Sequence, residues 1–122
     1  MRRMLVAILL LALIAMLWAT EQRAIDRICD GMLDNIKRLK EAEIDGIDEM
    51  LEQTEQDWKK HEGVLEMLTP HENTDEININ WASYKSRIKE GNYTAAGYVL
   101  DEMSQRFEEL SEKTKVSIEN IF

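Results

Sequence analysis

The feature that most constrains this chain is an unbroken run of sixteen apolar residues at positions 4–19. As an α-helix that rises about 1.5 Å per residue, the run is about 24 Å long, slightly less than the roughly 30 Å hydrocarbon core of a bilayer. Snorkelling by Arg2 and Arg3, or local thinning of the bilayer, can absorb the difference. Trp18 falls where an interfacial aromatic residue belongs. The run therefore predicts an N-terminal membrane anchor, residues 1–20, that contacts lipid through residues 4–19.

A cleaved signal peptide is the competing interpretation of the same run. Cleavage after Ala19 would place the bulky Leu17 where a small residue is preferred, so we expect the anchor to be retained. The two arginines before the run favour a cytoplasmic amino terminus, although Arg23 and Arg27 dilute this asymmetry. We expect a single-pass protein of the cell membrane whose C-terminal domain, residues 21–122, is extracytoplasmic.

The charge of the remaining chain is strongly acidic. Two of the 15 basic residues precede the apolar run, which leaves 13 against all 24 acidic residues, a net charge of −11. Such a surface is repelled by phosphate backbones, so nucleic acid is not expected as a partner, whereas basic partners suit it better. The simpler explanation, that this charge only keeps the domain soluble, stays open.

Four helical stretches can be recognised from apolar residues spaced three and four apart. The first covers about 21–40, with the stripe Ile25, Cys29, Met32, Ile36 and Leu39. The second covers about 44–68, with Ile44, Ile47, Leu51, Thr54, Trp58, His61, Leu65 and Leu68. The third contains Ile77, Trp81, Tyr84 and Ile88, although alternation over 77–81 would also suit a short strand. The fourth contains Tyr93, Ala96, Leu100, Met103, Phe107, Leu110, Thr114, Ser117 and Ile121.

The ends of these stretches carry recognisable signals. A phase slip between the first two stripes predicts a turn within Lys40–Gly46. Pro70 ends the second helix, and Asn73 with Glu76 resembles a capping box that opens the third. Gly91–Asn92 combines a C-terminal stop with an N-cap. Short connections make sequential helices antiparallel, so the expected fold is all-α: an N-terminal transmembrane helix followed by an up-and-down antiparallel helical bundle.

Few residues of the sequence could bind a metal ion or take part in catalysis. His61 and Asp57 lie one turn apart, but two ligands do not make a metal site, and a buried, hydrogen-bonded histidine is the simpler interpretation. His71, Glu72 and Asp75, where the chain enters the third helix, could bind a cation or a partner, or could form a solvated loop. The sequence contains no recognisable catalytic, cofactor or metal motif, so we expect no enzyme and no cofactor.

One cluster combines basic and aromatic residues: Lys85, Arg87 and Lys89 with Trp81 and Tyr84. Because the overall charge opposes nucleic-acid binding, we interpret it as an amphipathic helix with a polar face.

The whole chain resembles a bacterial family described as a domain of unknown function and typical of low-GC Gram-positive bacteria. The resemblance rests on the basic start and the single hydrophobic segment, on Trp58, on the His71–Glu72 junction, on the Gly91–Asn92 hairpin and on the tail Asn120–Phe122. This resemblance implies where the chain is located and how it folds, but it implies no activity.

The sole cysteine, Cys29, excludes an internal disulfide and bears on the oligomeric state. A parallel homodimer would align two copies of Cys29 at its seam, whereas a self-covered bundle would bury it. We favour the monomer. The leading functional hypothesis is a membrane-tethered, non-enzymatic interaction or scaffolding module with a protein partner. The alternative is a small ligand- or metal-sensing helical ectodomain.

Overall fold

The computed structural model describes residues 1–121, with side chains described for residues 1–113. The elements are α1 (Arg2–Glu41), the 3-10 helix η1 (Ile44–Gly46), α2 (Ile47–Leu68), α3 (His71–Lys89) and α4 (Tyr93–Ile121). The described residues contain four α-helices and no strand, which confirms the all-α prediction. The last three expected seam positions, Thr114, Ser117 and Ile121, lie outside the described side chains.

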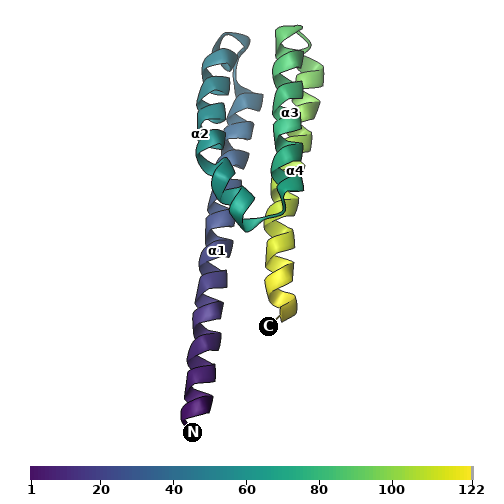
Figure 1. Ribbon diagram of the computed structural model, residues 1–122. Coiled ribbons are helices and arrows are strands. Elements are labelled where there is room, and N and C mark those ends of the chain that lie inside the picture. Colours follow the sequence, from purple (N-terminus) through teal and green to yellow (C-terminus); the bar gives the residue numbers. More distant parts are fainter. Residues whose placement is uncertain (122) are drawn as a thin grey trace.

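The helices alternate in direction along the chain (Figure 1). α1 packs against α2 and α4, and α3 packs against α4, whereas α2 and α3 meet over a smaller area. The N-terminal end of α1 projects beyond the other helices (Figure 1). The prediction of an N-terminal apolar helix followed by a helical bundle is therefore confirmed.

α1 continues from the apolar run into the bundle without a break. No side chain is buried as far as Ala24, and from Ile25 onward one face is buried against the bundle. The buried residues include the whole expected stripe: Ile25, Cys29, Met32, Ile36 and Leu39. α1 is long and apolar enough to cross a membrane.

The turn expected within Lys40–Gly46 is present. α1 ends at Glu41, and Ala42 is extended, with φ −67° and ψ 139°. The expected start of the second helix at Ile44 was wrong, because η1 occupies Ile44–Gly46 and α2 begins at Ile47. Consequently the Ile44 side chain is 63% exposed and lies outside the seam.

The connection between α2 and α3 is shorter than expected. Thr69 is extended ahead of Pro70, with φ −134° and ψ 161°, which ends α2 as predicted. The predicted capping box was wrong: Pro70 takes the N-cap position, and α3 begins at His71. Proline suits a helix start because its φ is already helical and a missing N–H costs nothing there. The Thr74 hydroxyl donates to the carbonyl oxygen of His71 at 3.0 Å, and Glu76 pairs with a residue of α4, Arg106.

The connection between α3 and α4 has the predicted stop and start. Gly91 has a φ of +76°. Its N–H donates to the carbonyl oxygen of Ile88 at 3.0 Å, and the N–H of Asn92 donates to that of Arg87 at 2.9 Å. These two bonds form a Schellman motif, in which glycine accepts the left-handed conformation without strain. The Asn92 side-chain oxygen then accepts the N–H of Ala95 at 3.2 Å and caps α4.

The core runs along the inner faces of all four helices. At its centre, the Trp58 ring meets the Phe107 ring edge to face, with centroids 5.8 Å apart. The α4 seam from Ala96 to Leu110 is buried as predicted. The prediction of a buried His61 was wrong. Its side chain is only partly buried, so it lies at the edge of the seam and not in the core.

Candidate functional site

The residues singled out for interaction lie in the first turns of α3. His71, Glu72 and Asp75 are all exposed, at the end of the bundle nearer the apolar half of α1 (Figure 1). Of these three, only Glu72 lines a neighbouring hollow of about 370 Å³, together with Leu68, Lys113 and others. The structure therefore places them on one surface without forming a shared pocket from them.

Of the His61–Asp57 pair, Asp57 takes part in a contact between two helices. The Asp57 carboxylate accepts a hydrogen bond from the amide of Asn35 on α1 at 2.9 Å, which ties α2 to α1. Across the chain whose side chains are described, no three His, Cys, Asp or Glu residues gather in a way that could hold a metal ion.

A larger hollow lies at the opposite end of the bundle, where α2 and α3 diverge. We call it the distal groove; its volume is about 690 Å³. Its lining comes from η1, α2, α3 and the start of α4: Ile44, Asp45, Ile47, Asp48, Leu51, Lys85, Ile88, Lys89 and Tyr93. Apolar side chains thus occur beside charges of both signs.

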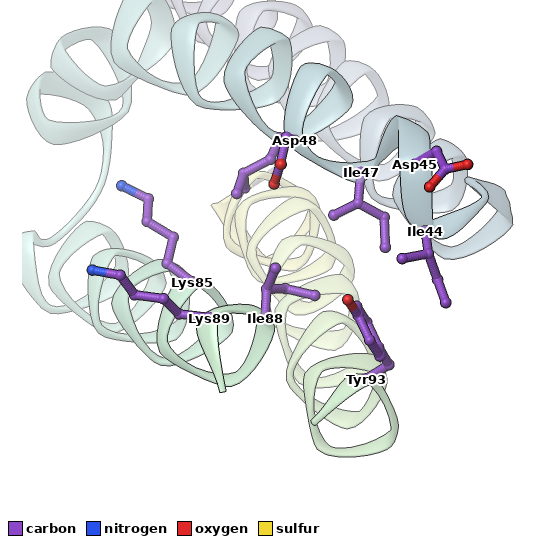
Figure 2. A pocket seen from close by; sticks show the side chains of 9 residues that line it. Ile44, Asp45, Ile47, Asp48, Lys85, Ile88, Lys89 and Tyr93 are labelled. Atoms are coloured by element: carbon purple, nitrogen blue, oxygen red, sulfur yellow. The ribbon is translucent and has the colours of Figure 1, made fainter. Parts of the chain in front are cut away.

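The two signs of charge lie on opposite walls of the distal groove. Figure 2 shows Asp45 and Asp48 on the side of η1 and α2, and Lys85 and Lys89 on α3. Lys85 also forms an ion pair with Glu55 of α2, which crosses from one wall to the other. A ligand in the groove would therefore meet carboxylates along one side and ammonium groups along the other.

The groove has an apolar floor and rim. Ile47 is buried, whereas Ile44 and Tyr93 are 63% and 42% exposed. A smaller hollow of about 160 Å³ adjoins the groove and extends toward α1, with Tyr84 and Leu100 in its lining. Burial raises the pKa of the Tyr84 hydroxyl above its usual value of 10.0, so this tyrosine is neutral at physiological pH.

Polar contacts hold the sparse α2–α3 interface together below the groove. The Trp58 indole N–H donates to the side-chain oxygen of Asn78 at 2.7 Å. The Asn78 amide in turn donates to Glu62 on α2, also at 2.7 Å. The two helices are thus joined near the middle of the bundle, and the Lys85–Glu55 ion pair joins them again at the groove.

Most of the chain matches a known protein family. A family model described as "Domain of unknown function (DUF4363)" matches residues 19–121. The chain belongs to this family. No curated protein and no solved structure matches it.

The DUF4363 match confirms part of the resemblance drawn from the sequence, namely membership of a family without a known function. The Gram-positive range and the membrane anchoring of its members stay predictions. The matched segment begins at Ala19, so it covers the bundle and only the last residue of the apolar run.

The distal groove of this DUF4363 chain was not predicted from the sequence, although part of its lining was noticed. The structure divides the basic-aromatic cluster: Trp81 and Tyr84 are buried, while Lys85 and Lys89 line the groove. Spacing on one helix could show that the lysines share a polar face. It could not show that Asp48, at the start of α2, would lie across the groove from these lysines.

Proposed function

We propose that this chain is a membrane-tethered, non-enzymatic interaction module that presents the distal groove to a protein partner on the extracytoplasmic side. The single observation that supports the proposal most is the groove itself, which combines apolar residues with walls of opposite charge at the end of the bundle farthest from the apolar run.

The tether is supported by the character of α1. Residues 4–19 of α1 are apolar, none of them is buried or charged, and the length and composition of the helix suit a membrane span. The Thr20 hydroxyl donates to the carbonyl oxygen of Met16 at 2.8 Å, so this polar group is satisfied within the helix. Such satisfaction is what a polar side chain needs at the edge of a hydrocarbon layer. The basic residues Arg2 and Arg3 support a cytoplasmic amino terminus.

The chemistry of the groove defines its partner. An amphipathic segment would place apolar side chains on Ile47 and Ile88, a basic side chain beside Asp48 and an acidic one beside Lys89. Charges arranged in this way select a register and steer association more than they add affinity. The exposed Ile44 and Tyr93 at the rim would supply the apolar contact area.

Site-specific photocrosslinking in membranes tests this proposal. We would place benzoylphenylalanine at Ile44 or at Tyr93, on the rim, and at Tyr98, which is 69% exposed but does not line the groove. We expect an adduct with a second protein from the rim sites only. The charge reversal Asp48→Lys should abolish it, because a basic partner residue would then be repelled. Adducts of equal yield from Tyr98, or adducts indifferent to the reversal, would contradict the proposal. An adduct of twice the chain mass would identify a second copy as the partner.

The volume of the groove supports a second candidate, a ligand-sensing ectodomain. About 690 Å³ lies within the roughly 300–1,000 Å³ of small-molecule sites. A melting-temperature screen of the full-length protein in detergent, against small anions, zwitterions and divalent cations, separates the two functions. A ligand that binds only the folded state raises the melting temperature, and Lys89→Glu should remove the effect if the ligand occupies the groove.

A further inference from the structure

A smaller hollow, which we call the inner hollow, adjoins the distal groove and has a volume of about 160 Å³. Four residues line both spaces, so the two form one continuous depression: Ile44, Ile47, Ile88 and Tyr93. From there the inner hollow reaches the end of α1 and the first turns of α4. The rest of its lining includes side chains that are almost fully buried, namely Leu39, Tyr84 and Leu100.

The inner hollow presents an apolar surface. Among the described residues that line it, Lys40 alone is charged, and the Lys40 ammonium forms an ion pair with Asp101 of α4. The other polar side chains of the lining are Tyr84 and Tyr93. Tyr84 is only 1% exposed, yet its hydroxyl has no hydrogen-bond partner among the residues whose side chains are described. An occupant of the hollow would therefore meet apolar walls and one hydroxyl that is available for a hydrogen bond.

Gly97, in the second turn of α4, helps to keep this space open. Glycine inside a helix is destabilising relative to alanine, so a glycine there calls for a reason. Of the three glycines within the α-helices, Gly97 alone is partly buried, whereas Gly31 and Gly63 are exposed. A Cβ added at Gly97 would meet no heavy atom of a neighbouring element within 4 Å. Close packing therefore does not require a glycine at this position, but a larger side chain would take up part of the inner hollow.

The size of the inner hollow matches one aromatic ring. An apolar protein cavity of about 150 Å³ binds benzene. In protein interfaces, aromatic side chains that fill pockets contribute most of the binding energy, whereas charges around them set the register. We infer that the protein partner of the distal groove inserts one aromatic side chain into the inner hollow, beside Gly97. This inference rests on the proposed function. The partner segment thus carries an aromatic residue in addition to the basic and acidic residues that suit the walls of the groove.

Disulfide capture of a benzyl group by the full-length protein in detergent tests whether the hollow holds a ring. Ala42 lines the inner hollow, so Ala42→Cys places a thiol there, and Ala82, exposed on α3, provides the matched control Ala82→Cys. Cys29 does not compete, because it is fully buried and the pKa of its thiol is about 12. Under partly reducing conditions, intact mass should show several-fold more benzyl thiol retained at Ala42→Cys than at Ala82→Cys. The polar mercaptoethanol should not distinguish the two sites.

Substitutions of Gly97 link this capture to the hollow. Gly97→Leu should remove the preference of Ala42→Cys for the benzyl group, because the leucine side chain takes up the space, whereas Gly97→Ala adds one methyl group and should keep most of it. Neither variant should lower the melting temperature, since alanine and leucine favour a helix more than glycine does. Equal capture at Ala42→Cys and Ala82→Cys, or capture that Gly97→Leu leaves unchanged, would refute the inference.

Photocrosslinking in membranes then tests the partner. Benzoylphenylalanine is placed at Asp45, which lines the distal groove but not the inner hollow. Gly97→Leu should lower the yield of the partner adduct several-fold, and Gly97→Ala should not. An adduct that persists at full yield in Gly97→Leu would refute the aromatic anchor and leave the proposed function standing. If no site in the groove gives an adduct, the proposed function fails, and the inference fails with it.

Discussion

The buried thiol of Cys29 makes the stability of the bundle sensitive to alkaline pH. Burial, together with the carboxylates of Asp26 and Asp30, raises the pKa of this thiol from 9.0 to about 12. Below about pH 8 the thiol is almost fully protonated in both the folded and the unfolded chain, so its full contribution to stability is present. As pH rises above 9, the unfolded chain ionises first and becomes more favourable, and the stability is lost progressively toward pH 12.

The size of the effect follows from the difference between the two pKa values. One pKa unit corresponds to about 1.4 kcal/mol, and between pH 8 and pH 10 the unfolded thiol changes from about one-tenth to about nine-tenths ionised. The free energy of unfolding should therefore fall by about 1.4 kcal/mol over this range. The result is the same for any folded-state pKa above about 11. Tyr84, whose pKa is also raised from 10.0, adds a further loss that begins as pH approaches 10 and grows above it, and this loss is common to the two proteins compared below.

The assay compares the natural chain with Cys29→Ala. Urea titrations of the full-length protein in detergent, under reducing conditions, are followed by the fluorescence of the buried Trp58 and Trp81. Cys29→Ala loses some packing at every pH, but its stability should fall by about 1.4 kcal/mol less between pH 8 and pH 10. Parallel pH profiles for the two proteins would refute the reasoning, because they would mean that the thiol is not shielded in the folded state.

Three further predictions concern the core, the anchor and the oligomeric state. Phe107→Ala should lower the free energy of unfolding by about 3–5 kcal/mol in urea titrations, because the ring is fully buried against Trp58, whereas the exposed control Glu108→Ala should change it by less than about 0.5 kcal/mol. Intact mass of the protein extracted from membranes should include the residues before Ala19, and a chain beginning at Thr20 would show cleavage. Mild oxidation in membranes followed by non-reducing electrophoresis should leave a monomer, and a dimer band that disappears in Cys29→Ser would establish the parallel homodimer instead.

The sequence predicted the helices and most of the core because both depend on local periodicity. The α4 stripe is buried from Ala96 to Leu110, since steps of three and four keep one face of a helix turned inward, whereas Tyr93 at its start is 42% exposed. The end of α3 at Gly91 was equally predictable, because this turn requires the left-handed backbone conformation that glycine adopts readily. Such signals lie within a few residues of the features they specify.

The predictions were wrong where the three-dimensional arrangement of the helices determines the position of a residue. Ile44 fits the α2 stripe by spacing, but the 3-10 turn rotates it outward to the rim of the groove. Asn73 and Glu76 have the spacing of a capping box, yet the helix begins earlier, with Pro70 at its N-cap position. Glu76 instead forms an ion pair with Arg106 of α4. The groove itself exists because α2 and α3 diverge, and nothing within either helix encodes that divergence.

If α1 spans a membrane as we propose, this unbroken helix also acts mechanically as a lever. About 21 residues separate the end of the apolar run from the last turn of α1, a distance of about 32 Å. Transmembrane helices tilt by about 20° on average, and a tilt of that size would carry the far end of α1, with the groove beside it, about 11 Å sideways. Since tilt responds to the thickness of the bilayer, a chain tethered in this way would hold the groove at a different position above a thinner or a thicker membrane.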